Sequence, residues 1–138
     1  MTPSLESSSE YERYIYSLPS LYPEIESSTL VFIRTGRYVA KITGEVLFKQ
    51  SLRLKVLQLV DFGRSEIPRY SYTVFRGQEK LYWYDPQPHP HLPELASTHP
   101  HHKHVPPDIK HHRIPAAGLS FVQPNLPFLI QEILALKV

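Results

Sequence analysis

Histidine is the side chain with the clearest chemical potential in this chain, and every copy lies in one short segment. All eight His residues fall within positions 89–112, and ten of the fourteen Pro residues fall within positions 86–127. Neutral imidazole accepts a proton and imidazolium returns one near neutral pH, so paired His residues can perform general acid–base chemistry. The sequence therefore places its candidate functional site in this segment.

The first interpretation of the segment is an acid–base site that acts on RNA. His101, His102 and His104 can move a proton from a ribose 2′-OH to a leaving 5′-oxygen. Lys103, which stands among them, can hold the phosphate and stabilise its developing charge. Asp85, earlier in the chain, can orient one imidazole through a hydrogen bond. On this interpretation no cofactor is required.

The second interpretation is a metal site, because neutral imidazole is the commonest metal ligand. Two imidazoles separated by one residue share a face of an extended backbone, and three such pairs occur: His89/His91, His99/His101 and His102/His104. The candidate ligands for a divalent ion are His89, His102 and His104. No Cys is present, and no spacing matches a defined zinc motif.

A third interpretation stays open, in which these His residues are solvated surface packed beside Pro. It applies most to the four members outside the densest run, which are His91, His99, His111 and His112.

The elements that must position this segment are strands. Strand-like patterns follow one another at residues 30–33, 38–49, 52–59, 70–75 and 81–84. Most alternate apolar and polar residues, as expected of strands with one face in a core. The connections are short enough for antiparallel pairing, so the sequence predicts an antiparallel meander of four or five strands. The alternation shifts at Leu57, which predicts either a bulge or a strand covered on both faces.

The last two of these predicted strands contain five aromatic residues: Tyr70, Tyr72, Tyr82, Trp83 and Tyr84. Aromatic side chains in strands most often form core or cross-strand pairs. On an open sheet face they could instead stack nucleobases.

A helix is predicted at each end of the meander. Residues 9–16 form a short helix that Ser8 or Ser9 can cap and that Pro19 prevents from extending. Asn125 is predicted to cap the second helix, whose apolar stripe must dock on the sheet; the stripe comprises Leu126, Leu129, Ile130, Ile133 and Leu134. Residues 86–123, rich in Pro and His, are predicted to be loop or polyproline-like coil. The expected fold is a single α+β domain over residues 1–138.

Charge is unevenly distributed along the chain. Residues 1–29 hold five Glu and one Arg, a net charge of −4, whereas residues 30–138 hold 14 basic and 8 acidic side chains, a net charge of +6. A basic body suits a polyanion such as RNA, although a solvated basic surface is equally common. No apolar run is long enough for a membrane helix, the first residues are polar, and Cys is absent. These features predict a cytoplasmic protein.

The order of these pieces resembles the TumE-like toxin family of toxin–antitoxin modules. The matching pieces lie within residues 10–135: Val46-Leu47-Phe48 with Ser51-Leu52, Val60-Asp61, Tyr70-Ser71-Tyr72, Tyr84-Asp85, Pro88-His89, Leu92-Pro93-Glu94, Pro100-His101-His102-Lys103-His104-Val105, and the closing helix. The Pro-His-His-Lys-His element is the most specific of them. The chain departs from the family pattern at three positions. Trp83 and Pro86 stand where the pattern has Arg and Asn, and Gln58 stands where it tends to have an acid.

The resemblance implies a small toxin that inhibits growth and that a neighbouring antitoxin binds and neutralises. Many toxins of this size act on RNA, so ribonuclease is the enzyme activity that the resemblance suggests. The residues carried over by the motif are His89, His101, His102, Lys103 and His104, preceded by Tyr84 and Asp85. The alternatives are a module that binds protein or RNA without catalysis and a metal-dependent hydrolase that uses the His cluster.

Overall fold

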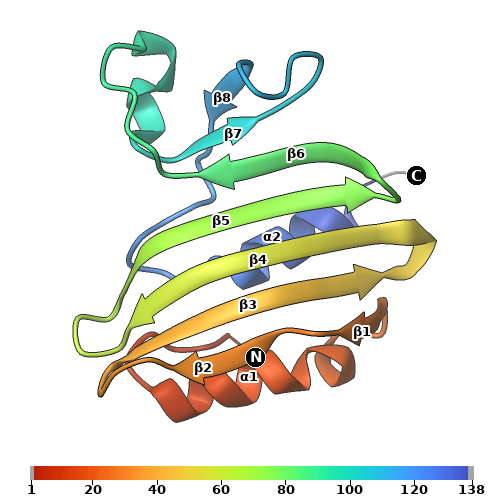
Figure 1. Cartoon of the computed structure of the whole chain (residues 1–138), viewed down its shortest axis with the longest axis vertical. Helices are drawn as coiled ribbons and strands as arrows, with labels where there is room; N and C mark the ends of the chain where they lie inside the picture. The colour runs from red at the N-terminus through yellow and green to blue at the C-terminus, as the bar shows by residue number, and fades with distance from the viewer. Residues whose placement is uncertain (1, 137–138) are drawn as a thin grey trace.

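The alternating segments form one antiparallel sheet, in a computed structural model that describes residues 2–136. The strands are β1 (Ile25–Ser28), β2 (Val31–Arg34), β3 (Val39–Phe48), β4 (Leu52–Asp61), β5 (Glu66–Arg76), β6 (Glu79–Asp85), β7 (His102–His104) and β8 (Arg113–Pro115). Their order is β1-β3-β4-β5-β6-β7-β8, and β2 pairs with β3 beside β1 (Figure 1). The α+β class and the antiparallel meander are confirmed, but four or five strands was too few.

The central hairpins follow the predicted pattern, and β4, β5 and β6 are longer than predicted. Strands β3 and β4 pair continuously from Val39↔Asp61 to Leu47↔Arg53. The turn between them contains the 3₁₀ segment Lys49–Ser51, in which Gln50 and Ser51 adopt positive φ. Strands β5 and β6 join through Gly77, which also has positive φ, a conformation that glycine adopts without strain.

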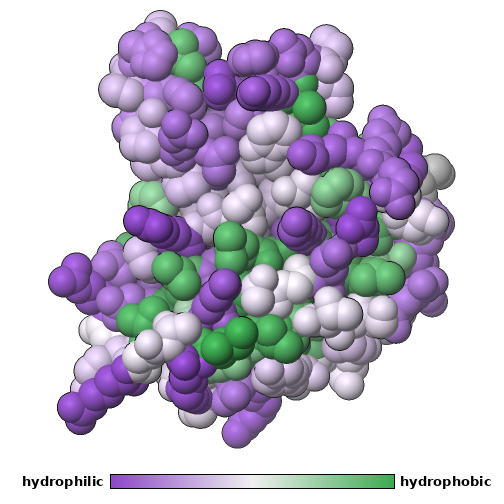
Figure 2. All heavy atoms as spheres, viewed as in Figure 1, coloured by the Kyte–Doolittle hydropathy of each residue, from purple (hydrophilic) through white to green (hydrophobic). Residues whose placement is uncertain are grey.

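Both helices pack on the same face of the sheet, here called the inner face (Figure 1). Helix α1 (Ser8–Leu21) lies along β1 and β2, and α2 (Leu126–Leu134) lies behind β4 and β5. Four residues of the predicted apolar stripe of α2 are buried, and the fifth, Leu134, is partly buried. None of the helices within residues 2–136 is long and apolar enough to cross a membrane. The opposite surface, here called the outer face, faces the viewer in Figures 1 and 2.

The predicted boundary of the first helix was wrong. Ser7, rather than Ser8 or Ser9, is the N-cap, and its hydroxyl accepts the backbone N–H of Glu10. The helix then continues through Pro19 to Leu21. Pro19 lies in the last turn, where it removes a single backbone donor while Tyr22 N still donates to the carbonyl of Leu18. A proline so close to the end of a helix does not prevent the final turn.

The predicted cap of the second helix was also wrong in its chemistry. Asn125 does precede α2, but its side chain makes no capping bond to the helix. Its Oδ1 accepts the N–H of Ser120, and its Nδ2 donates to the carbonyl of Ser120 and to the hydroxyl of Tyr72. The side chain therefore ties the preceding turn to the sheet.

The shift in alternation at Leu57 has a different cause from either one predicted. Strand β4 keeps its register through Leu57, whose side chain is exposed on the outer face. Gln58 takes the inward position and is 0% exposed. Its amide donates to the hydroxyl of Tyr11 and accepts the hydroxyl of Tyr72. A polar residue in a core position produced the apparent phase change, since these bonds satisfy its amide.

The prediction of loop throughout residues 86–123 was wrong at three places. A 3₁₀ helix, η2, spans Pro93–Thr98, and β7 and β8 extend the sheet beyond β6. The Pro residues lie almost entirely outside β7 and β8. Because no Pro lies within β7, its backbone N–H groups can pair with β6 on one side and β8 on the other. The most specific sequence motif in the chain thus contains a strand.

Candidate active site

Strands β6 and β7 bring together residues that are far apart in the sequence. Asp85 pairs with His102, and Trp83 pairs with His104. Side chains directly opposite each other in a sheet share a face, and alternate residues along one strand do so too. All four side chains therefore project from the outer face, beside β8.

Three of these side chains converge on one point. His102 Nε2 lies 3.1 Å from Asp85 Oδ1, His104 Nε2 lies 3.2 Å from Asp85 Oδ2, and the two Nε2 atoms lie 3.1 Å apart. His102 is 1% exposed and His104 is 4% exposed, whereas the carboxylate is partly open to solvent. We call Asp85, His102 and His104 the outer-face triad.

Backbone carbonyls fix how the two imidazoles are protonated. The Nδ1 atom of His102 lies 3.1 Å from the carbonyl oxygen of Pro100, and that of His104 lies 2.9 Å from the carbonyl oxygen of Ile109. A carbonyl oxygen only accepts, so each Nδ1 carries the hydrogen. In the neutral form of each ring, the Nε2 atom then presents a lone pair to the carboxylate and to the other imidazole.

The carboxylate of Asp85 is held by two further donors. The indole Nε1–H of Trp83 donates to Oδ2 at 3.2 Å, and the backbone N–H of Gln87 donates to Oδ1 at 2.9 Å. Burial alone would raise the pKa of Asp85, but these bonds and the interaction with His102 outweigh it and hold that pKa well below its usual range. Trp83 also stacks on the ring of His104, with centroids 4.0 Å apart.

The triad requires a positive charge at its centre. A carboxylate and two Nε2 lone pairs within hydrogen-bond distance repel one another unless a proton or a metal ion lies among them. A shared proton would make the imidazoles acid–base groups, and a metal ion would make them ligands. Burial lowers the pKa of His104, which favours its neutral form.

His89 and Arg113 border the triad. The ring of His89 meets that of His102 edge to face, with centroids 5.0 Å apart. Arg113 stands opposite His104 in the β7–β8 pair and so projects from the same face. Burial, followed by the charge of Arg113, lowers the pKa of His89. The Nε atom of Arg113 is buried without a hydrogen-bond partner in the described part of the chain.

Lys103 and Tyr84 lie on the inner face, away from the triad. Lys103 Nζ is 3.3 Å from a carboxylate oxygen of Glu132 in α2 and 4.1 Å from the ring centroid of Tyr82. The hydroxyl of Tyr84 donates to the same carboxylate at 2.7 Å. Alternation along β7 places Lys103 opposite to its two His neighbours, so the structure does not bring it to them.

His101 also lies apart from the triad. Its Nδ1 contacts the hydroxyl of Tyr70, a residue of the inner face, and its ring packs against Phe121. Of the seven predicted site residues, the structure thus brings together His89, Asp85, His102 and His104. Tyr84, His101 and Lys103 form contacts on the other side.

Arg113 is the site residue that sequence analysis missed. It stands outside the Pro-His-His-Lys-His element, in a stretch predicted to be loop, and only the pairing of β8 with β7 places it beside His104. Two nearby His residues fit solvated surface instead: His111 contacts the exposed Asp108, and His112 contacts the carbonyl of Pro106.

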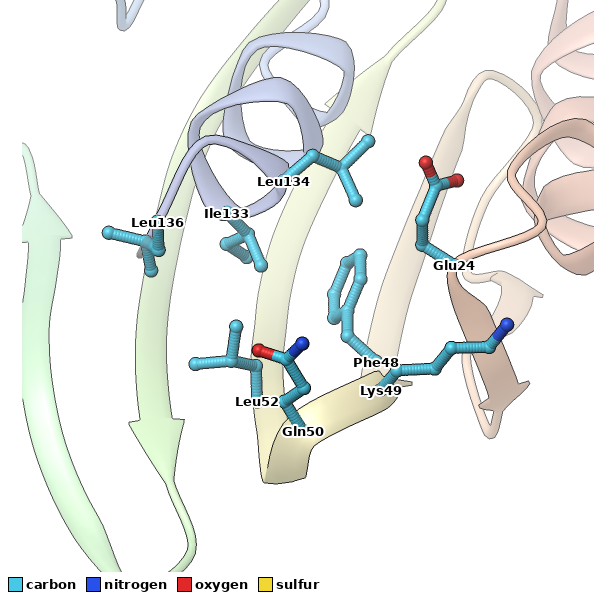
Figure 3. A pocket seen from close by; sticks show the side chains of 8 residues that line it. All are labelled: Glu24, Phe48, Lys49, Gln50, Leu52, Ile133, Leu134 and Leu136. Carbon is cyan, nitrogen blue, oxygen red and sulfur yellow. The ribbon is translucent and has the colours of Figure 1, made fainter. Parts of the chain in front are cut away.

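A pocket at the far end of α2 has none of this chemistry. It lies where the β3–β4 turn meets the end of the helix (Figure 3) and is lined mainly by apolar side chains. The polar side chains at its rim are those of Glu24, Lys49 and Gln50, and no imidazole lines it. The triad is therefore the stronger candidate for a reactive centre.

Comparison with known families gives one match. A family model described as Toxin TumE matches residues 12–136, nearly the whole chain, and confirms the resemblance that the motifs indicated. No curated protein and no solved structure matches the chain.

Proposed function

The chain belongs to the TumE toxin family, and from that membership we propose that it inhibits growth by cleaving RNA at the outer-face triad. As a member of a toxin family it is the toxin of a toxin–antitoxin system, with a cognate antitoxin as its partner. The observation that carries the proposal is the convergence of Asp85, His102 and His104, with His89 and Arg113 at its border.

The charge of the outer face supports RNA as the substrate. Lys41, Lys55 and Arg69 occupy outward positions on β3, β4 and β5, and Arg113 does so on β8. Residues 30–138 carry a net charge of +6. A cationic surface beside a reactive centre attracts a polyanion and holds its phosphates. Figure 2 shows this face hollowed between two projections, one carrying η2 and the other leading into β8.

The border residues suit two of the tasks of phosphodiester cleavage. His89 lies at the rim of the triad and is only partly buried, so its imidazole can take the proton of an attacking ribose hydroxyl. The guanidinium of Arg113 can bind the non-bridging phosphate oxygens as negative charge develops on them. The positive charge at the centre of the triad, a proton or a metal ion, can position the phosphate and stabilise the leaving 5′-oxygen. As the 2′-oxygen bonds to phosphorus, the bond from phosphorus to that 5′-oxygen breaks, and the proton taken up by His89 can pass to it.

Purified protein incubated with total RNA and with transfer RNA tests this proposal. Wild type should cleave at least one of these substrates, and its expression should arrest growth unless the antitoxin is co-expressed. His89→Ala and Arg113→Ala should each reduce cleavage by at least about tenfold, given general acid–base and electrostatic contributions of about 10²–10⁴. His111→Ala is the matched control, since it removes an exposed imidazole that contacts only Asp108.

Two outcomes would overturn the proposal. Growth arrest without cleavage of any RNA, at any divalent-metal concentration, would leave the toxin but reject RNA as its target. Equal cleavage by wild type, His89→Ala and Arg113→Ala would place the chemistry elsewhere on the molecule.

A further inference from the structure

We propose that the outer-face triad binds one divalent transition-metal ion, through a carboxylate oxygen of Asp85 and the Nε2 atoms of His102 and His104. The binding itself is independent of the proposed function, and only the catalytic use of the ion rests on that function.

The spacing of the ligand atoms is the first argument. The three contacts are 3.1, 3.2 and 3.1 Å long, and all of the atoms concerned lie within 4.8 Å of one another. Zinc–nitrogen and zinc–oxygen bonds are about 2.0–2.2 Å, so neighbouring ligands around such an ion lie about 3.0–3.5 Å apart. An ion fits among these atoms with little movement of the side chains.

The orientation of each ligand is the second argument. An imidazole that binds a metal usually donates its other N–H to a carbonyl or carboxylate, and a ligating carboxylate is itself hydrogen-bonded. Here Nδ1 of His102 donates to Pro100, and Nδ1 of His104 donates to Ile109. Asp85 accepts from Trp83 and from the backbone of Gln87. Every ligand thus has its supporting partner, and both Nε2 atoms are directed inward.

A metal ion also satisfies the triad better than a proton does. One proton lies along a single line between two atoms, and it would leave the other two contacts of the triad without a cation between them. A cation at the centre bonds all three ligands at once. Burial of both imidazoles makes an unrelieved contact costly, because repulsion between electron pairs is less screened away from water.

The donor set indicates which ions fit. Two imidazoles and one carboxylate suit zinc, manganese and ferrous iron, whereas magnesium and calcium favour oxygen ligands alone. Three protein ligands leave at least one coordination position free, which is typical of metal sites that act on a substrate and not of structural zinc sites. The partly exposed carboxylate of Asp85 lies on the open side of the cluster.

Metal titration of untagged protein tests the site. The protein is purified without nickel resin, stripped with a chelator and titrated with Zn²⁺ by calorimetry and with Co²⁺ by visible absorption. Wild type should bind one ion per chain. His104→Ala and Asp85→Asn should weaken binding at least about a hundredfold, since loss of supporting partners alone typically costs about 10–100-fold.

Two further variants are controls. One tests whether weaker binding reflects unfolding, and the other tests whether the ion binds to exposed imidazoles. Trp83→Phe keeps an aromatic ring over His104 but removes the indole donor to Asp85. It should fold as judged by circular dichroism and weaken binding by about tenfold. His111→Ala, which removes an exposed imidazole, should bind as wild type does.

The outcomes separate this inference from the proposed function. Wild type that binds no ion would overturn the inference, as would full binding by both Asp85→Asn and His104→Ala. Loss of the ion in His111→Ala would place it on the surface and would also overturn the inference. One bound ion in a protein that cleaves no RNA would uphold the site and reject the proposed function.

Discussion

Gln58 links both helices to the sheet, and its replacement should destabilise the fold by a predictable amount. Its side chain is 0% exposed. Its Nε2 donates to the hydroxyl of Tyr11 in α1, and its Oε1 accepts the hydroxyl of Tyr72 in β5. Asn125, just before α2, donates to that same Tyr72 hydroxyl at 3.2 Å. One buried amide thus stands at the centre of a chain of bonds from α1 to α2.

Gln58→Leu should lower the free energy of unfolding by about 3 kcal/mol. Leucine fills nearly the same space, so the loss comes from two buried hydroxyls that each lose a partner, at about 1–3 kcal/mol each. The apolar side chain offsets part of that loss. A domain of 138 residues loses about 3–4 °C of melting temperature per kcal/mol. The expected fall in melting temperature is therefore about 10 °C.

Urea unfolding of four proteins measures the interaction free energy between Gln58 and Tyr11. They are wild type, Gln58→Leu, Tyr11→Phe and the double variant. The double variant removes both partners of one bond, so it should cost about 1–2 kcal/mol less than the sum of the single variants. Gln78→Leu, the same change at an exposed turn position, is the control and should stay within about 0.5 kcal/mol of wild type.

The reasoning would be refuted by additive effects of Gln58→Leu and Tyr11→Phe, or by equal urea midpoints for Gln58→Leu and Gln78→Leu. Because Gln58 lies on the inner face, metal binding by the folded fraction should be the same in wild type and Gln58→Leu. A loss of metal binding without a loss of stability would mean that the two faces of the sheet are coupled through β4.

Three other substitutions test separate parts of the structure. Lys103→Met should lower the free energy of unfolding in urea by about 1–3 kcal/mol, because it leaves the half-buried carboxylate of Glu132 without its cation. RNA cleavage by that variant should match wild type. Gly44→Ala should cost at least about 2 kcal/mol in the same assay, because Gly44 has φ +135° and a Cβ there would lie 2.5 Å from the carbonyl oxygen of Thr29. Arg113→Gln should reduce the slope of log RNA affinity against log salt by about 0.7, the contribution of one contact to a single-stranded phosphate.

Alternation along strands could be predicted from the sequence because it follows directly from burial. The meander and the apolar stripe of α2 follow from apolar spacing, and the structure confirms them. Gln58 was misinterpreted because its partners, Tyr11 and Tyr72, are distant in the sequence. A polar residue in a core position is indistinguishable from a change of phase until those partners are known.

The sequence predicted which residues form the site better than it predicted how they are arranged. The spacing of His102 and His104 predicted one shared face, which the structure shows. The same rule requires Lys103 to project from the other face, but that conclusion holds only if the segment is a strand. A strand of only three residues, in a segment rich in proline, shows too little alternation of apolar and polar residues to be predicted. Arg113 depends on a second three-residue strand and was missed for the same reason.

The site occupies the part of the sheet with the shortest strands, which gives ligand binding a structural consequence. Strands β7 and β8 have three residues each and lie at one edge of the sheet. Such short pairings open more readily than the long pairings of β3, β4 and β5. A ligand held between Asp85 of β6 and the two His residues of β7 would join the edge to the stable meander. It would stabilise the edge by mass action as well as serve chemistry. The reactive residues and the order of the edge therefore depend on each other, so occupancy of the triad should determine whether Arg113 on β8 is held in place to meet a phosphate.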